Sequence, residues 1–274
     1  MSTASIEPVR GVKSIIAIGS GKGGVGKSTT AVNLALALHA EGVRVGLLDA
    51  DIYGPNQPLL LGIHQQPTIN ADQRIDPVLQ YGLQTMSMGY LLDEGAPLVW
   101  RGPMISKALQ QMLYQTAWDA LDYLIVDLPP GTGDITLTVA QKMPLCGAVI
   151  VTTPQDVAVL DAKKALLAFR KLEVPVLGLI ENMSTHICSA CGHAEAIFGT
   201  EGGERLASTY EVPFLGRLAL DASIRIDADR GMPSVVACPE GPVAASYRTI
   251  ARNLRAVVAL RPKEKTVLKP VIIT

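Results

Sequence analysis

The amino-acid sequence predicts an α/β fold in which a mostly parallel sheet is wrapped by helices, and three observations lead to this prediction. Short apolar runs alternate with helix-like segments along most of the 274-residue chain, as in a parallel sheet that is covered on both faces. A glycine-rich phosphate-binding loop joins the first apolar run to the first helix-like segment. Aspartates directly follow two of the runs, so polar groups are expected to gather where the strands end.

Apolar runs of four to six residues mark the expected strands, and longer segments with helical periodicity mark the expected helices. The strands are expected at 14–19, 43–48, 123–126, 148–151 and 176–180, and the helices at 28–40, 106–117 and 157–172. Residues 57–95 have weaker periodicity and scattered Pro, Gly and Gln, which predicts loops with short strands. One domain, which contains the phosphate-binding loop and the C-x-x-C pair, is expected over 13–261, flanked by a flexible N-terminal segment (1–12) and a C-terminal tail (262–274).

Composition excludes several classes of partner. The chain is 48% hydrophobic and its formal net charge is −1, so it can bury a substantial core but lacks the positive field that attracts nucleic acid. No apolar run approaches the roughly 18 residues that span a bilayer, and the N-terminus lacks the apolar core of a secretory signal. We therefore expect a cytoplasmic protein with no nucleic-acid or membrane partner.

The phosphate-binding loop runs from Gly21 to Thr29 and matches the pattern G-x-x-x-x-G-K-[ST]. In this pattern glycines let backbone N–H groups close around phosphate oxygens, Lys27 reaches the outer phosphates and Ser28 supplies a ligand to Mg²⁺. The sequence therefore predicts a site for a nucleoside triphosphate and Mg²⁺. The residues expected to contact the nucleotide are Gly21, Lys22, Gly23, Gly24, Val25, Gly26, Lys27, Ser28 and Thr29.

Carboxylates follow two of the expected strands. Asp49 and Asp51 come after the run 43–48, and Asp127 follows the run 123–126. Asp49 and Asp127 are candidates for the magnesium side of the site, and Asp51 is the candidate for orienting an attacking water. Aspartates at strand ends also cap helices and form turns, which is the alternative for each one taken singly. The loop 128–134 joins prolines to glycines and is expected either to switch between two arrangements or to be an ordinary rigid loop.

Two of the four cysteines, Cys188 and Cys191, have the C-x-x-C spacing of a metal or redox site. One chain supplies two thiolates, whereas a four-iron cluster or a tetrahedral zinc needs four ligands, so two chains that meet at this motif would complete a four-thiolate site. His186 and His193 flank the pair and offer a zinc site within one chain, although this spacing is crowded. A dithiol redox pair and an inert loop also stay open. The other cysteines, Cys146 and Cys238, are expected to be buried.

Several segments together resemble the Mrp-type iron–sulfur cluster carriers, which belong to the deviant Walker-A ATPases with MinD and ParA. The resemblance covers about 13–254 and is carried by the P-loop with Lys22 and by the segments 49–56, 127–134, 152–156 and 181–184 with Cys188 and Cys191. It implies that Lys22 crosses a two-fold interface to reach the partner's phosphates and is catalytic with Lys27 and Asp51. It also implies that Asn182 contacts adenine and that a four-iron, four-sulfur cluster bridges two protomers.

This chain departs from the resemblance at Ser189 and Ala219, where many members have proline, but neither departure removes a ligand. The expected function is therefore a homodimeric, slowly ATP-hydrolysing carrier that passes its cluster to apo-proteins. A positioning ATPase of the MinD and ParA kind is one alternative, and it would need a basic patch or a membrane-binding helix. A zinc-stabilised nucleotide-binding protein without a cluster is the other.

Overall fold

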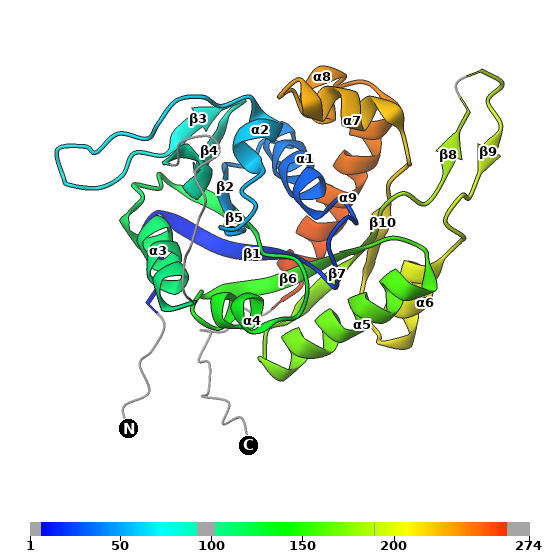
Figure 1. Cartoon of the computed structure of the whole chain (residues 1–274), viewed down its shortest axis with the longest axis horizontal. Helices are drawn as coiled ribbons and strands as arrows, with labels where there is room; N and C mark the ends of the chain where they lie inside the picture. Colours follow the sequence, from blue (N-terminus) through cyan, green and yellow to red (C-terminus); the bar gives the residue numbers. More distant parts are fainter. Residues whose placement is uncertain (1–6, 92–101, 189, 262–274) are drawn as a thin grey trace.

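A computed structural model describes residues 7–91, 102–188 and 190–261, in which a central sheet is covered by helices on both faces (Figure 1). The strand order is β10-β7-β6-β1-β5-β2-β4-β3, and every pair is parallel except β3 and β4. The predicted fold class is therefore confirmed. The strands of this sheet are β1 (Val12–Ser20), β2 (Val45–Asp49), β3 (Val78–Gln80), β4 (Leu83–Ser87), β5 (Leu121–Asp127), β6 (Leu145–Thr152), β7 (Val176–Glu181) and β10 (Phe214–Arg217).

The helices form two layers. One face of the sheet carries α3, α4, α5 and α6, and the other carries α1 packed against α9 (Figure 1). The helices are α1 (Lys27–Ala40), α2 (Gln57–Leu61), α3 (Gly102–Gln115), α4 (Asp134–Gln141), α5 (Asp156–Lys171), α6 (Gly202–Thr209), α7 (Ala222–Asp229), α8 (Ser234–Ala237) and α9 (Pro242–Ala259). No helix in these ranges is long and apolar enough to cross a bilayer.

The strands form where they do because their residues are apolar on both faces. All five residues of β2 and the last six of β1 are buried, which is the burial pattern of a parallel sheet between two helix layers. Each expected strand and helix is present, with ends that shift by a few residues. Burial of these apolar side chains therefore stabilises the strands at the positions that the apolar runs predicted.

The segment 57–95 contains more regular structure than expected. The short strands are present, and β4 is a full member of the main sheet beside β2. The prediction missed α2, which has Pro58 in its first turn and is followed by Gly62 with φ +63°. Proline in the first turn and glycine after the last turn favour this helix, but five residues are too few to produce a visible period. Residues 92–95 lie outside the described residues.

The chain ends fall mainly outside the described ranges, which omit residues 1–6 and 262–274 of the expected terminal segments. Within the described part of the N-terminal segment, Val9 is buried, and the hydroxyl of Tyr114 donates a 3.2 Å hydrogen bond to the carbonyl oxygen of Glu7. Val9 therefore packs against the domain, and the backbone of Glu7 is held beside α3.

Candidate nucleotide and metal sites

A pocket of about 480 Å³ opens at the edge of the sheet where the parallel strands end. Carboxyl ends of parallel strands are where α/β folds place their ligands. The P-loop forms one wall of the pocket, and α2 and α7 contribute to the others. Its lining includes Gly23, Gly24, Lys27, Ser28, Asp51, Asn182, Leu220, Ile224 and Arg225.

The P-loop turns sharply from β1 into α1. Gly24 and Gly26 have φ values of +81° and +80°, and Gly26 is the residue just before the helix. This left-handed conformation suits glycine because a side chain would be strained there. The amides of the first turn of α1 have no carbonyl partner within the helix, so they form an anion site beside the pocket.

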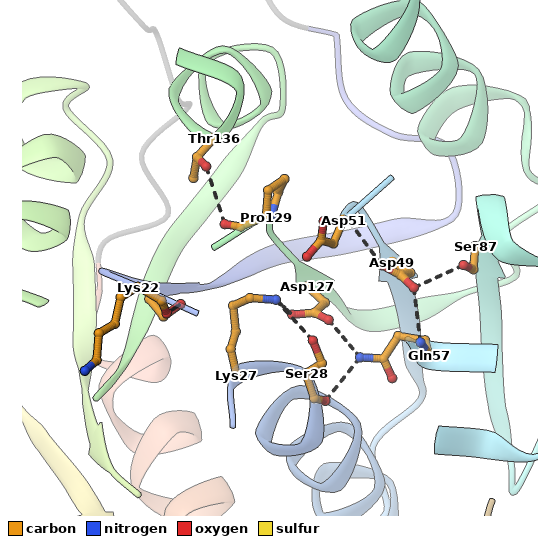
Figure 2. Close-up of polar contacts among 11 residues, drawn as sticks. Lys22, Lys27, Ser28, Asp49, Asp51, Gln57, Ser87, Asp127, Pro129 and Thr136 are labelled. Carbon is orange, nitrogen blue, oxygen red and sulfur yellow. Dashed lines mark hydrogen bonds and ion pairs between the residues drawn. The ribbon is translucent and has the colours of Figure 1, made fainter. Parts of the chain in front are cut away.

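Lys27 and Asp127 form a buried ion pair behind the P-loop. The ammonium Nζ of Lys27 lies 2.5 Å from Oδ1 of Asp127, and the two side chains are 6% and 0% exposed. The same ammonium donates a 3.2 Å hydrogen bond to Oγ of Ser28 (Figure 2). Lys27 therefore has to turn toward the pocket, and share or leave Asp127, if it is to bind the outer phosphates of a nucleotide.

The two aspartates after β2 have different surroundings. Asp49 is buried and accepts hydrogen bonds from the amides of Asp51 (3.1 Å) and Gln57 (3.2 Å) and from the hydroxyl of Ser87 (3.1 Å) (Figure 2). Burial, together with the nearby charge of Asp127, raises the pKa of Asp49 to about 8. Asp51 lines the pocket, and burial raises its pKa as well. Ser28 and Asp51 therefore face the pocket, whereas Asp49 and Asp127 lie behind it.

Gln57 is a member of this network that sequence reasoning missed. Its side-chain Nε2 donates to Oδ2 of Asp127 (2.9 Å) and to the carbonyl oxygen of Ser28 (3.1 Å). Only the proline that follows it could have indicated that Gln57 begins a helix, and nothing in the sequence pairs it with Asp127. Gln57 thus connects the segment after β2 to both the P-loop and β5.

Asn182 lies at the end of β7 and lines the pocket. Its side-chain Nδ2 donates a 2.8 Å hydrogen bond to the carbonyl oxygen of Val25, and its backbone amide donates to the carbonyl oxygen of Thr152 (2.7 Å). Asn182, which the resemblance assigns to adenine, therefore also holds the P-loop at Val25.

Lys22 is half-buried at the rim of the pocket. Its side chain extends away from Lys27 and Asp127 (Figure 2). The P-loop is tightly packed against α5 here, because a Cβ on Gly21 would lie 2.1 Å from the carbonyl carbon of Asp161. On the same helix Val157 and Leu160 are 66% and 54% exposed, so an apolar surface lies close to Lys22.

The loop after β5 contacts the start of the P-loop. The amide of Gly131 donates a 3.0 Å hydrogen bond to the carbonyl oxygen of Ser20, and Thr136 Oγ1 lies 3.4 Å from the carbonyl oxygen of Pro129. Pro130 lines the pocket. This loop is therefore positioned to respond to phosphates, while the side chain of Asp134 lies outside what the structure describes.

The C-x-x-C motif lies on a hairpin that projects from the body of the domain (Figure 1). Strands β8 (His186–Ile187) and β9 (Ala194–Glu195) pair antiparallel. Cys188 is half-buried and Cys191 is exposed, and Ser189 is outside the described residues. Hydrogen bonds from the backbone of Ala190, and then of Cys191, lower the pKa of the Cys188 thiol, which favours the thiolate that binds metals.

A zinc site within one chain is not assembled in the described ranges. Over 7–91, 102–188 and 190–261, no three His, Cys, Asp or Glu side chains come together in a way that could hold a metal ion. The ring Nδ1 of His186 lies 3.0 Å from the carbonyl oxygen of Leu220 instead. Among its described residues, the hairpin therefore presents a pair of thiols and no complete ligand set of its own.

The prediction that Cys146 and Cys238 are both buried is wrong for Cys238. Cys146 is half-buried, whereas Cys238 is exposed. Cys238 follows the last residue of α8 and begins a turn, in which the amide of Gly241 donates a 3.0 Å hydrogen bond to its carbonyl oxygen. The turn lies at the surface, so a small apolar side chain there has no core to enter.

One segment, residues 218–221, contacts both the pocket and the hairpin. Ala219, Leu220 and Asp221 line the pocket. The amide of Leu220 donates a 2.9 Å hydrogen bond to the carbonyl oxygen of Thr185, and the amide of Ser184 donates to the carbonyl oxygen of Leu218 (3.0 Å). A ligand that moves this segment would therefore move the base of the hairpin.

Comparison with known proteins assigns the chain to a family. A family model described as ParA, NUBPL iron-transfer P-loop NTPase, matches residues 11–255. The chain is 57% identical over 249 residues to the iron-sulfur cluster carrier protein of Escherichia coli (strain K12), covering 90% of this chain and 68% of that protein. It is 50% identical over 250 residues to the iron-sulfur cluster transfer protein NUBPL of Mus musculus, covering 90% and 78%.

Solved structures support the same assignment. The nucleotide-binding protein of Archaeoglobus fulgidus, determined in complex with ADP, has a TM-score of 0.74 and 35% identity over 86% of this chain and 90% of that one. The cell division ATPase MinD of Pyrococcus furiosus shares the fold, with a TM-score of 0.69 and 23% identity over 89% and 99%. The resemblance to the Mrp-type carriers is confirmed, and the chain belongs to the ParA/NUBPL family of iron-transfer P-loop NTPases.

Proposed function

We propose that this protein is an ATP-hydrolysing iron–sulfur cluster carrier that works as a homodimer. The observation that carries the proposal is that one chain combines a phosphate-binding pocket with a projecting pair of thiols, and that the segment 218–221 contacts both. The names of its relatives, a cluster carrier in Escherichia coli and a cluster transfer protein in Mus musculus, point to the same activity.

The nucleotide is proposed to bind with its phosphates in the P-loop. Gly21 to Thr29 would supply backbone amides, and Lys27 would leave Asp127 for the outer phosphates. Ser28 and Asp51 line the pocket, with Asp49 and Asp127 behind them, and this all-oxygen donor set suits Mg²⁺. When bound, the ion would neutralise charge on the phosphates. Asp51 is proposed to orient the attacking water and Asn182 to contact the base.

Two chains are proposed to pair through the face that carries Lys22. The lysine extends away from the phosphate site of its own chain (Figure 2), and Val157 and Leu160 provide exposed apolar surface on the adjacent helix α5. Burying such surface in a two-fold interface is favourable. A lysine from the partner would then stabilise charge on the phosphates, as an arginine finger does.

The cargo is proposed to be a four-iron, four-sulfur cluster held by Cys188 and Cys191 of both chains. Two thiols per chain match half of the four ligands that such a cluster needs. The projecting hairpin leaves Cys191 exposed, which suits a cluster that is handed to an apo-protein. Because the site needs free thiols, we infer that the protein works in a reducing compartment such as the cytoplasm.

Hydrolysis is proposed to drive transfer by linkage. ATP can promote release only if the nucleotide states bind the cluster with different affinity. The segment 218–221 supports such coupling, because it lines the pocket and bonds to Ser184 and Thr185 at the base of the hairpin.

Anaerobic reconstitution tests the proposal. Wild-type protein should retain about four irons and four sulfides per dimer, and replacing Cys188 and Cys191 by alanine should abolish this. The matched control replaces Cys146 and Cys238, which lie outside the hairpin, and should keep the cluster. Transfer is then followed as activity gained by an apo four-iron enzyme. Iron content unchanged by the hairpin double variant, or a strictly monomeric protein under all nucleotide conditions, would refute the proposal.

A further inference from the structure

Gln57 occupies an unusual position for a long polar side chain. It is the first residue of α2 and is 1% exposed. Its amide Nε2 contacts both the P-loop, through the carbonyl oxygen of Ser28, and β5, through Oδ2 of Asp127, while its backbone amide bonds Asp49 (Figure 2). One residue thus joins three segments that carry the proposed magnesium-side groups.

The orientation of the Gln57 amide is determined by its partners. Ser28 and Asp127 both present acceptors, at 3.1 Å and 2.9 Å from the same nitrogen, so the NH₂ group has to face them. The oxygen Oε1 is then buried and has no hydrogen-bond partner among the described residues. An unpaired buried acceptor destabilises the fold, which is a reason to look for a role of the amide other than packing.

That role follows from the ion pair between Lys27 and Asp127. In the described part of the chain, the side chains of Lys27 and Gln57 donate hydrogen bonds to Asp127. When Lys27 moves to a phosphate, Asp127 stays fully buried and loses its charged partner. Gln57 is then the donor that still holds the Asp127 carboxylate, because its second anchor on Ser28 does not depend on Lys27.

We propose that Gln57 is a positioning residue for the metal ion: in the nucleotide-bound protein it holds Asp127 and the Ser28 segment in the arrangement that Mg²⁺ requires. The inference rests on the ATP and Mg²⁺ site of the proposed function. In this role Gln57 does not contact the nucleotide. Its contribution should therefore be confined to the linkage between metal binding and nucleotide binding.

The experiment measures binding of a fluorescent ADP analogue with excess Mg²⁺ and with EDTA. The dissociation constant in EDTA divided by the dissociation constant in Mg²⁺ reports how far the metal tightens nucleotide binding. Gln57→Met keeps the side-chain length and removes the amide. It should reduce this ratio about ten-fold, as expected for loss of a hydrogen bond to a charged group, and leave the EDTA value within about two-fold of wild type.

Gln80→Met is the matched control, because Gln80 Nε2 bonds the carbonyl oxygen of Leu61 (2.9 Å) at the other end of α2. It should keep the wild-type ratio. If Gln57→Met fails to fold, Gln57→Asn takes its place, since an amide one methylene shorter cannot reach both acceptors. A folded variant with the wild-type ratio, or one that loses affinity equally in Mg²⁺ and EDTA, would overturn the inference. Wild-type protein that binds no analogue would instead refute the proposed function.

Discussion

The side chain of Asn182 donates a 2.8 Å hydrogen bond to the carbonyl oxygen of Val25, although 157 positions separate the two residues. The bond joins the end of β7 to the turn that enters α1. Gly26 follows Val25 at φ +80°, and a Cβ on it would lie 2.3 Å from Asn182 Nδ2. The shape of the phosphate-binding loop therefore depends on a glycine and on a distant strand together.

Replacing Gly26 by alanine should damage both folding and nucleotide binding. The methyl group would be strained at positive φ and would displace Asn182, so we expect the free energy of unfolding to fall by about 1–3 kcal/mol. Nucleotide affinity should fall by at least about ten-fold, because the amides of the loop would no longer converge on the phosphates. Urea unfolding and titration with ADP measure the two effects.

Gly23→Ala is the control for stability, because a Cβ on Gly23 would have no heavy atom of the described residues within 4 Å, its chain neighbours aside. It should change the free energy of unfolding by no more than about 0.5 kcal/mol. Equal losses of stability in the two variants would contradict the role assigned to the contact between Gly26 and Asn182.

The proposed action of Lys22 in trans predicts complementation between two inactive variants. Lys22→Ala and Asp51→Asn should each hydrolyse ATP very slowly as homodimers. In a mixed dimer, the chain with intact Asp51 receives Lys22 from its partner and regains one complete site. Random mixing should therefore restore about a quarter of wild-type ATPase activity. Activity is measured after the two purified variants have been allowed to exchange subunits.

The control for this mixture is each variant mixed with itself at the same total concentration. If Lys22 acts only on the nucleotide of its own chain, neither site of the mixed dimer is complete, and the mixture stays as slow as its components. That outcome would contradict the proposed action of Lys22 on the nucleotide of its partner.

Protein stability should depend on pH through Asp49. Burial, with the charge of Asp127 second, raises the pKa of Asp49 from 3.8 to about 8. The folded protein therefore binds this proton more tightly than the unfolded chain, so the stabilisation is complete below about pH 4 and is lost as the pH rises toward 8. We expect the free energy of unfolding to decline less steeply over this window in Asp49→Asn than in wild type.

Urea unfolding at several pH values across the window makes this comparison. The difference between the two proteins isolates Asp49 from other groups, such as Asp51, whose pKa burial also raises. Parallel profiles for wild type and Asp49→Asn would show that Asp49 does not carry the extra proton.

His186 offers a test of communication between the pocket and the cysteine hairpin. Its ring Nδ1 lies 3.0 Å from the carbonyl oxygen of Leu220, and Leu220 lines the pocket. In His186→Phe this bond is lost, while the thiols and the P-loop are unchanged. We expect cluster content and ADP affinity within about two-fold of wild type. The cluster release rate should respond less to nucleotide, because only the backbone bonds of segment 218–221 to Ser184 and Thr185 still join the pocket to the hairpin.

His193→Phe is the matched control, because His193 is exposed and lies just before β9 in the same hairpin. Release from this variant should keep the nucleotide response, followed as loss of the visible absorbance of the cluster in the presence of a chelator. A normal response in His186→Phe would indicate that the signal does not pass through this hydrogen bond.

Much of the fold and part of the site follow from local patterns in the sequence. The spacing from Gly21 to Thr29 specifies a phosphate-binding turn, and apolar runs followed by Asp49 and Asp127 specify buried parallel strands with polar ends. Helix α2 was not predicted, because five residues are too few to show a helical period. The exposure of Cys238 was not predicted either, because the residues next to it in the chain do not indicate whether it lies at the surface.

The sequence by itself determined the class of fold, the phosphate-binding loop and the pair of thiols, because each depends on residues that are close together in the chain. Only the tertiary structure decided that Gln57 holds Asp127, that Asn182 braces Val25 and that His186 lies against Leu220. These contacts join segments that the strand order of the sheet brings together. That order is selected by the burial of the whole core, which no local pattern encodes.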